Sequence, residues 1–257
     1  MEDYEGFKKQ IFALTQIDLN AYKEKQMRRR IDSLIAKNGV STYQDYVNLL
    51  KANKTKFEEF VNYLTINVSE FYRNPEQWAI LENEILPQLM KKTNSLKIWS
   101  AACSTGDEPY SLVMMLSRHM PLSSIRILAT DIDKQVLEKA KNGLYNVKSL
   151  KGLPQDFMKR YVLKVNEYTY KISDEVKRCV EFKQHNLLKD SYPKDCDLIV
   201  CRNVLIYFTE EAKLEIYKNF NNSLKKDGIL FVGSTEQIIQ ASTIGFATAK
   251  SFFYRKL

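Results

Sequence analysis

The chain has 257 residues, of which 44% are hydrophobic and 27% charged, a composition typical of a globular protein with one large domain or one large and one small domain. Only two histidines, His119 and His185, are present, so a histidine-based metal site or a Ser-His-Asp triad is disfavoured. The net charge of +8 comes from residues 91–257, which carry 27 basic and 18 acidic residues, whereas residues 1–90 are nearly neutral.

Neither the N-terminus nor the cysteines point to an exported or membrane-inserted protein. The first ten residues are charged and contain no hydrophobic signal core, and no apolar run approaches the ~18 residues of a membrane span. The four cysteines form no C-x-x-C pair, so we expect reduced thiols, no metal and a cytoplasmic location. They are Cys103, Cys179, Cys196 and Cys201.

Residues 1–86 are predicted to be entirely helical, because apolar residues recur at helical spacing and are separated by capping signals. Asn38-Gly39 ends one helix, and Ser41-Thr42 caps the next. After Pro75 the helical pattern resumes. The predicted helices lie near residues 7–14, 20–37, 43–50, 55–65 and 77–90.

The second predicted helix carries a local basic patch. Residues 23–37 contain six basic residues against only Glu24 and Asp32. Such a face favours an acidic partner, and nucleic acid is one candidate. The alternative is a solvated basic face, which is the usual role of a run of charges.

From residue 96 onward short apolar runs alternate with helical segments, which predicts an α/β domain with a mostly parallel sheet wrapped by helices. Residues 144–179 interrupt this alternation, and we expect a small β insertion there, with a helix near Pro154–Tyr161 and extended pieces at Tyr168–Ser173 and Val176–Cys179. The C-terminal residues could add an antiparallel edge strand. The predicted strands are 96–102, 125–133, 180–186, 197–202 and 229–233, and the predicted helices between them are 109–118, 134–142 and 209–226, the last ended by Asp227-Gly228.

Acidic residues follow the first two predicted strands, where ligands bind in open α/β sheets. Asp107 and Glu108 follow the first strand without a G-x-G-x-x-G pattern, so they favour a cationic or hydroxyl-bearing ligand without phosphate. The alternative is that they only stabilise a helix N-terminus. After the second strand we assign Asp131 to a ribose and Asp133 to the N-cap of the next helix.

An amide and an apolar pair follow the third predicted strand. Asn186 could hydrogen-bond the edge of an adenine, and Leu187 could pack on its face. Each of these signals is weak alone. At consecutive strand ends they together indicate a nucleoside that carries a positive charge and no phosphate, a description that fits S-adenosylmethionine.

Six stretches of the chain resemble the bacterial chemotaxis receptor methyltransferase family, CheR. They occur in the family order over nearly the whole chain and are highly specific as a set. The resemblance implies a class I S-adenosylmethionine-dependent methyltransferase fold that is Rossmann-like, with a helical N-terminal domain and a small β insertion. The stretches are LTINVSEFYRNP (64–75), KIWSAACSTGDEPYS (97–111), LATDID (128–133), FKQHNLL (182–188), DLIVCRNVLIYF (197–208) and LFVGSTEQI (230–238).

The resemblance also implies a set of cofactor contacts. Ser69 stands where the family often has Thr, and Asp107 stands where Glu is usual, so both keep the chemical type. Arg73 could pair with the methionine carboxylate, or it could be a surface arginine at a helix end. The implied cofactor-binding residues are Asn67, Ser69, Arg73, Glu108, Asp131, Asn186, Leu187, Arg202 and Asn203.

The implied reaction is methyl esterification of receptor glutamates, with S-adenosylhomocysteine as the second product, which serves sensory adaptation in chemotaxis. A glutamate with a pKa of ~4.3 is already ionised at neutral pH, so no general base is expected and catalysis should rest on positioning in a dry pocket. Arg73 and Tyr207 are the candidate catalytic residues for this positioning. For Tyr207, a role as a packed aromatic is equally compatible with the sequence.

The resemblance assigns residues 1–76 to receptor docking and residues 77–257 to methyl transfer, with the insertion at about 144–179. The expected partner is the cytoplasmic helical bundle of methyl-accepting chemotaxis receptors, to whose arrays a monomeric enzyme would be recruited. The docking candidates are Lys23, Lys25, Arg28, Arg29 and Arg30. Residues 161–168 are short and lack the glycine of relatives that bind a receptor C-terminal peptide, so we expect no such tether.

Two other functions remain to be weighed. A nucleic-acid methyltransferase fits the basic pI of about 9.1, but the Asn/Asp-Pro-Pro-aromatic motif of base-flipping enzymes is absent at Arg202–Leu205. A non-catalytic adaptor with the same fold should have lost cofactor positions, whereas here each is filled.

Overall fold

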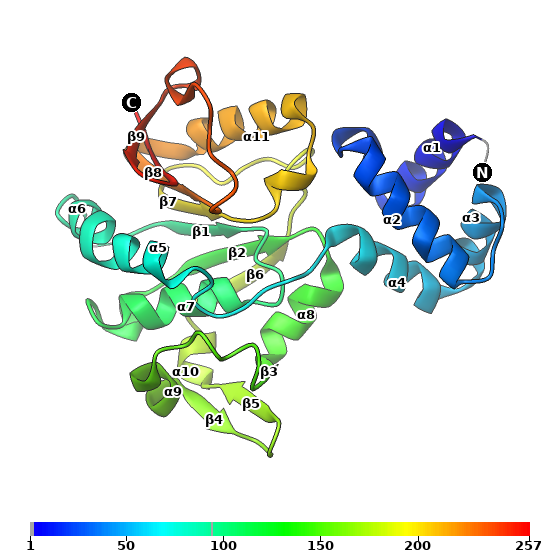
Figure 1. Ribbon diagram of the computed structural model, residues 1–257. Helices are drawn as coiled ribbons and strands as arrows, with labels where there is room; N and C mark the ends of the chain where they lie inside the picture. Colours follow the sequence, from blue (N-terminus) through cyan, green and yellow to red (C-terminus); the bar gives the residue numbers. More distant parts are fainter. Residues whose placement is uncertain (1–2, 94) are drawn as a thin grey trace. The chain divides into compact units, whose positions relative to one another are not determined.

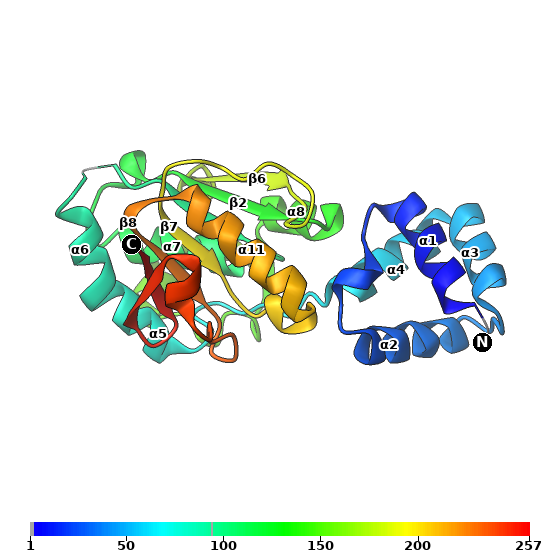
Figure 2. The same ribbon diagram turned by 90° about the horizontal axis from the view of Figure 1, so that it is seen from above.

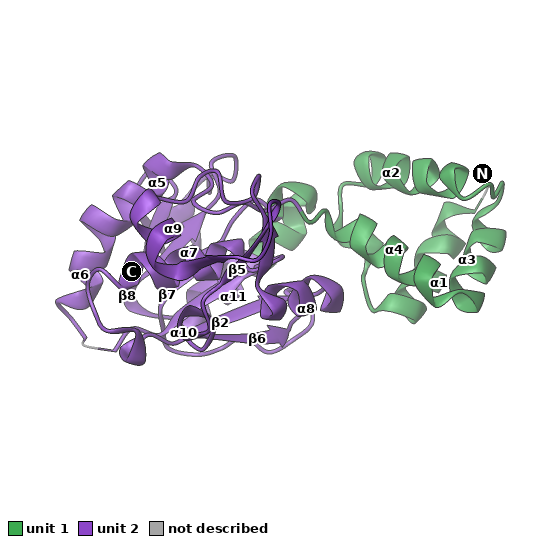
Figure 3. Cartoon of the chain, turned by 90° about the horizontal axis from the view of Figure 1, so that it is seen from below, with its two compact units in different colours: residues 1–67, 205–215 green, residues 68–204, 216–257 purple. Residues whose placement is uncertain are grey.

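The computed structural model describes residues 3–93 and 95–257, which form two compact units (Figure 3). Unit 1 comprises the described residues up to Asn67 together with Leu205–Glu215. Unit 2 comprises Val68–Val204, except for residue 94, and Ile216–Leu257. Among these described residues, no helix has the length and apolar character needed to span a bilayer.

Unit 1 is a small helical bundle, as predicted. Its core is largely aromatic, and Phe7, Tyr46 and Phe60 are almost completely buried. Thr42 caps α3 by accepting a hydrogen bond from the Asp45 backbone N–H, as its sequence position predicts. The helices are α1 (Tyr4–Thr15), a 3-10 turn (Leu19–Ala21), α2 (Glu24–Lys37), α3 (Tyr43–Ala52) and α4 (Lys54–Thr65).

A segment from the C-terminal half of the chain completes unit 1. It holds a 3-10 turn, Leu205–Tyr207, and the start of α11 (Glu210–Ser223). An isolated antiparallel bridge joins Tyr22 to Phe208, whose rings stack with centroids 4.6 Å apart. This segment is therefore held on the residues that directly precede α2.

Unit 2 contains a seven-stranded sheet in the order β6-β2-β1-β7-β8-β10-β9 (Figure 1). The first five strands in this order are parallel, and β10 runs antiparallel to both of its neighbours. This order and direction confirm the predicted α/β fold. The strands are β1 (Ile98–Ala101), β2 (Ile127–Asp131), β6 (Val180–Gln184), β7 (Cys196–Cys201), β8 (Leu224–Val232), β9 (Phe246–Lys250) and β10 (Phe253–Lys256).

Helices cover both faces of this sheet. Figure 1 shows α11 on one face and α7 and α8 on the other, and the view from above shows α11 crossing the sheet (Figure 2). Helix α7 is buried along nearly its whole length, which explains the continuous apolar run at residues 112–116. Apart from α11 and the helices of the insertion, the helices of this unit are α5 (Pro75–Ile80), a π-helical turn (Leu81–Ile85), α6 (Leu86–Met90), α7 (Asp107–Leu116), a 3-10 turn (Leu122–Ser124), α8 (Lys134–Asn142) and a 3-10 turn (Ala241–Ile244).

The predicted β insertion is a separate three-stranded antiparallel sheet in the order β3-β5-β4. The prediction of extended structure from Val176 was wrong, because Val176 is a buried residue of a short helix. The elements of the insertion are β3 (Leu144–Asn146), α9 (Gln155–Tyr161), β4 (Val162–Lys164), β5 (Thr169–Ile172) and α10 (Asp174–Lys177).

The predicted end of the last helix was also wrong. Helix α11 ends at Ser223 rather than at 226, because Leu224 is buried and pairs with Cys196 as the first residue of β8. Asp227-Gly228, expected to end a helix, lies inside β8. The expected antiparallel edge strand is β9, and a second C-terminal strand, β10, lies between it and β8.

Candidate functional site

Most of the predicted cofactor residues of unit 2 follow the carboxyl ends of its parallel strands. Because the strands β6, β2, β1 and β7 are parallel neighbours, their carboxyl ends lie at one edge of the sheet. The topology therefore gathers the predicted side chains that the sequence distributes over about 100 positions. These are Glu108 after β1, Asp131 at the end of β2, Asn186 and Leu187 after β6, and Arg202 and Asn203 after β7.

Asp131 is held in one orientation by backbone donors. Its Oδ2 accepts a hydrogen bond from the Ser104 N–H at 2.8 Å, and its Oδ1 accepts one from the Asp133 N–H at 3.0 Å. The residue is only 6% exposed, and this burial raises the pKa of Asp131 to about 6 although the backbone donors oppose the shift. A ligand that brings hydroxyl donors would stabilise the ionised form of this buried carboxylate.

Asp133 has the capping role that the sequence predicts. Its Oδ1 accepts a hydrogen bond from the Gln135 N–H at 2.8 Å, at the start of α8. The two aspartates of the LATDID stretch therefore differ in function, since one caps a helix and the other lies at the carboxyl edge of the sheet.

The first turn of α7 brings a second buried carboxylate to this edge. Asp107 Oδ2 accepts a hydrogen bond from the Thr105 hydroxyl at 2.5 Å, whereas its buried Oδ1 has no hydrogen-bond partner among the described residues. Burial raises the pKa of Asp107, and the hydroxyls of Thr105 and Ser69 oppose this rise. The tight turn before α7 requires Gly106, whose φ is +91°.

Glu108 is paired with a buried guanidinium. Its Oε1 accepts a hydrogen bond from the Ser100 hydroxyl at 2.8 Å, and its Oε2 lies 3.6 Å from Arg202 Nη1. The two side chains are 13% and 3% exposed. Burial raises the pKa of Glu108, and the positive charge of Arg202 opposes this rise. The pair therefore partly compensates two charges that would each be costly to bury alone.

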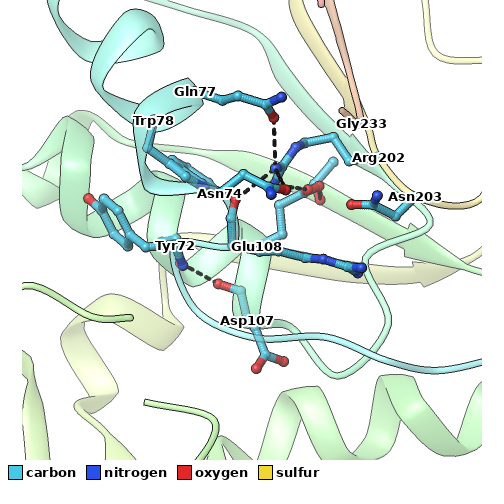
Figure 4. A network of polar contacts seen from close by, with 12 residues as sticks. Tyr72, Asn74, Gln77, Trp78, Asp107, Glu108, Arg202, Asn203 and Gly233 are labelled. Atoms are coloured by element: carbon cyan, nitrogen blue, oxygen red, sulfur yellow. Dashed lines mark hydrogen bonds and ion pairs between the residues drawn. The ribbon is translucent and has the colours of Figure 1, made fainter. Parts of the chain in front are cut away.

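Arg202 also holds the segment that precedes α5. Its Nη2 donates to the Arg73 carbonyl at 2.7 Å, to Asn74 Oδ1 at 3.1 Å and to Gln77 Oε1 at 3.0 Å (Figure 4). The guanidinium also lies over the Phe231 ring, 4.7 Å from its centroid. We call residues 68–74 the strap. Arg202 thus links the end of β7 to the carboxyl end of the strap.

The strap carries two predicted cofactor residues, Ser69 and Arg73. The Arg73 guanidinium donates to the Val68 carbonyl at 3.3 Å, within the strap itself. Tyr72 and Asn74 have positive φ values of 52° and 60°, which are uncommon for residues with a side chain. Such a conformation persists only where the surroundings hold it, so the strap is a constrained element rather than a loose linker.

The loop after β6 has a fixed turn. The Asn186 N–H donates to Asp190 Oδ2 at 2.8 Å, and the Asn186 Oδ1 accepts from the Leu188 N–H at 2.9 Å. The Tyr192 hydroxyl donates to the Leu187 carbonyl at 2.7 Å. Asn186 and Leu187, the predicted adenine contacts, are therefore presented on a preformed loop.

A further residue, Glu236, fixes the turn after β7 and was not predicted. Its Oε2 accepts hydrogen bonds from the Asn203 N–H at 2.6 Å and from the Gly233 N–H at 2.8 Å. Gly233 must lack a side chain, because a Cβ there would lie 2.8 Å from the Asn203 nitrogen. The stretch LFVGSTEQI contains Glu236, and an acid shortly after an apolar strand was the available signal.

The other predicted residues belong to unit 1. Asn67 Nδ2 donates to the Thr65 hydroxyl at 2.8 Å, at the end of α4. The Tyr207 carbonyl accepts a hydrogen bond from the Lys23 N–H at 2.9 Å, directly before α2. The structure therefore places Tyr207 in the segment that is held on the start of the predicted docking helix.

Three of the five predicted docking residues line one shallow groove along α2, namely Lys25, Arg28 and Arg29. Among the described residues, the side chains of Lys25 and Arg29 form no ion pair, whereas Arg28 lies over the Tyr4 ring, 5.0 Å from its centroid. Arg30 instead faces α4, since its Nη2 donates to the Tyr63 carbonyl at 2.7 Å. Lys25 and Arg29 are thus the exposed cations of this face.

Both parts of the chain match models of one protein family. A family model described as "CheR methyltransferase, SAM binding domain" matches residues 67–252, and one described as "CheR methyltransferase, all-alpha domain" matches residues 2–65. A protein named "Chemotaxis protein methyltransferase" from Listeria innocua is 40% identical over 99% of this chain and 97% of its own length. One with the same name from Escherichia coli is 33% identical over 88% of this chain and 81% of its own length.

The Arg202–Glu108 pair generates a stability prediction. We expect Arg202→Met to lower the free energy of unfolding by about 3–5 kcal/mol, because Glu108 is left buried without its counter-charge. Glu108→Gln in the same chain should recover part of this loss, so the double variant should be more stable than the sum of the single effects predicts. Urea unfolding followed by tryptophan fluorescence measures this in unit 2, which contains both tryptophans, Trp78 and Trp99. Additive effects would contradict the pairing.

Proposed function

Because this chain belongs to the CheR methyltransferase family, we propose that it transfers a methyl group from S-adenosylmethionine to glutamate side chains of methyl-accepting chemotaxis receptors. The products are glutamate methyl esters and S-adenosylhomocysteine, and the reaction serves sensory adaptation. The observation that carries the proposal is the buried carboxylate of Asp131 at the end of β2, on the same sheet edge as Glu108 and Asn186.

The residues of this edge fit S-adenosylmethionine chemically. Asp131 provides a buried acceptor for the ribose hydroxyls, and Asn186 and Leu187 provide an amide and an apolar surface for the adenine. The orphan Oδ1 of Asp107 indicates that this acidic edge favours donors or a cation over a phosphate. The proposed binding residues are Asn67, Ser69, Arg73, Glu108, Asp131, Asn186, Leu187, Arg202 and Asn203.

Not all of these residues need to touch the cofactor. All three hydrogen bonds of Arg202 Nη2 go to the strap and α5, so we assign Arg202 to holding the strap and neutralising Glu108. Arg73, whose guanidinium makes one long contact with the strap backbone, is the better candidate for pairing with the methionine carboxylate.

The proposed chemistry requires no general base. When bound, the cofactor supplies a methyl group on a sulfonium, and an oxygen of the substrate glutamate forms the new C–O bond while the C–S electron pair returns to sulfur. Because the glutamate is ionised at neutral pH, the task of the protein is to align the reactants and exclude water. Arg73 and Tyr207 are the proposed positioning residues.

We propose that residues 1–76 dock the receptor and residues 77–257 carry out methyl transfer. Supporting this, Lys25 and Arg29 are exposed, lie one helical turn apart and have no ion-pair partner among the described residues. An acidic helical bundle of a receptor matches this charge. The enzyme would act as a cytoplasmic monomer recruited to receptor arrays, without contacting nucleic acid.

We also propose that no receptor C-terminal peptide tethers this enzyme. The loop between β4 and β5 consists of residues 165–168 and is closed by Asn166, whose Oδ1 accepts from the Tyr168 and Thr169 N–H groups. This compact turn is closed by its own hydrogen bonds, which argues against a longer peptide-binding loop at this position.

Methanol release tests the proposed function. The full chain is incubated with tritiated S-adenosylmethionine and receptor-bearing membranes, and the washed protein is then treated with alkali. Volatile labelled methanol marks a carboxyl methyl ester and excludes N- or C-methylation. Binding of the cofactor without any methanol from any receptor would favour a non-catalytic adaptor, and label transferred to RNA would favour a nucleic-acid enzyme.

The raised pKa of Asp131 predicts that cofactor binding releases a proton. Its pKa of about 6 in the free protein should fall when ribose hydroxyls donate to the carboxylate, because these donors favour the ionised form. Near pH 5.5 binding should therefore release a proton and affinity should fall as the pH drops, whereas near pH 7.5 no proton should be released. Calorimetry with S-adenosylhomocysteine in two buffers of different ionisation enthalpy measures this.

Asp131→Asn is the matched control, because the amide cannot titrate. Proton release that persists in this variant would show that another group is responsible.

The docking face predicts a selective loss of receptor methylation. Arg29→Glu should lower the methylation rate by about tenfold or more at low salt, because it places a negative charge against an acidic receptor surface. Lys51→Glu, an exposed reversal on α3, is the matched control and should have little effect. Binding of S-adenosylhomocysteine should be unchanged in both. Equal methylation by the two variants at low salt would rule out docking by this face.

The absence of a tether predicts no heat of binding when a receptor C-terminal peptide is titrated into the full chain. The same hairpin exposes the apolar side chains of Leu163, Val165 and Tyr168, to which a peptide could bind. The titration therefore tests the prediction directly. Tight binding of the peptide would overturn this part of the proposal.

A further inference from the structure

The strap is fixed from both sides by parts of unit 2 that lie far from it in sequence. On one side, the Tyr72 N–H donates to the Ser111 hydroxyl of α7 at 3.2 Å, and that hydroxyl donates to the Asp107 carbonyl at 2.7 Å. On the other side, the Phe71 N–H donates to the Ser149 carbonyl at 3.2 Å. Ser149 belongs to the first turn of the β insertion, so the insertion contacts one side of the strap.

Gly152 makes the closest approach between the insertion and the strap. A Cβ placed on Gly152 would lie 2.5 Å from the Phe71 carbonyl oxygen, well inside van der Waals contact. The opposing atom belongs to the backbone rather than to the end of a flexible side chain. Any side chain at position 152 must therefore move either the turn or the strap.

Neither the insertion turn nor the strap can move without disturbing the packing of the core. Leu150 and Leu153, on the two sides of Gly152, are 3% and 4% exposed and belong to the hydrophobic core of unit 2. Phe71 is completely buried, and its ring meets the Tyr145 ring edge-on with centroids 4.9 Å apart. Because close-packed interiors transmit a displacement instead of absorbing it, a methyl group here should shift the strap backbone.

We infer that Gly152 is a positioning residue of the cofactor site, which acts by letting the insertion turn hold the strap and thus Ser69 and Arg73. The inference rests on the proposed function, in which these two residues bind S-adenosylmethionine. Phe71 lies two residues from each of them, and Arg202 fixes the strap again at the Arg73 carbonyl. The insertion is accordingly part of the machinery that shapes the cofactor site, and not only an appendage of the fold.

The test compares Gly152→Ala with Lys151→Ala, a change at the adjacent, exposed residue. We expect the Kd of S-adenosylhomocysteine, measured by calorimetry on the full chain, to rise about tenfold or more in Gly152→Ala and to stay within about twofold in Lys151→Ala. The KM for S-adenosylmethionine should rise with it, whereas the KM for receptor should not change. Wild-type affinity in Gly152→Ala would overturn the inference.

Hydrogen exchange separates a local effect from general destabilisation. In Gly152→Ala the amides of Phe71 and Tyr72 should exchange faster while those of β1 and β7 keep their protection; uniform acceleration would contradict a positioning role. If Gly152→Ala does not fold, Ser111→Ala loosens the strap from the other side and should weaken binding in the same selective way, and unchanged binding would overturn the inference. Failure of the wild-type chain to bind S-adenosylhomocysteine would overturn the proposed function itself, together with this inference.

Discussion

The burial of one guanidinium organises the site of this protein. Arg202 lies at the end of β7, where a charge without partners would be unfavourable, and burial lowers its pKa. Glu108 and three acceptors from the strap and α5 compensate for the loss of water around it. Since these partners come from three separate parts of the chain, their contacts with this single charge also hold the sheet edge, α7 and the strap together.

The acidic edge of the sheet is ordered by local hydrogen bonds as well as by this ion pair. Asp107 and Asp131 are buried and Glu108 is largely so, and burial raises the pKa of each. Backbone N–H groups orient Asp131, a hydroxyl orients Asp107, and a hydroxyl and a guanidinium orient Glu108. Burial therefore makes the ionised form of each carboxyl group less favourable in the free protein. A ligand that carries hydrogen-bond donors and a positive charge would stabilise these ionised forms. Such preorganisation reduces the ordering that binding must accomplish.

Sequence patterns predicted the local features of this site and missed the long-range ones. Asp131 ends β2, Asn186 lies two residues after β6, and Arg202 directly follows β7, so their places at the sheet edge followed from the alternation of strands and helices. Glu236 and Gly152 act on segments 33 and 81 residues away in sequence, on Asn203 and Phe71, and no local pattern reports such contacts. Likewise, Leu224 was assigned to a helix because only its pairing with Cys196 shows that it begins a strand. Tertiary contacts override local preference at such positions.

The positions of the constrained residues relate this architecture to the proposed chemistry. Tyr72, Asn74, Ala102, Ser104 and Asn203 all have positive φ values without being glycine, and all lie in the strap or in the turns after β1 and β7. A reaction between an ionised carboxylate and a sulfonium needs no proton transfer, so its rate depends on how rigidly the reactants are aligned and how well water is excluded. Strained turns held by buried hydrogen bonds provide this rigidity in the free protein. The strained backbone thus lies around the proposed site, where it would hold the reactants in line. The proposed mechanism depends on this rigidity and not on a catalytic acid or base.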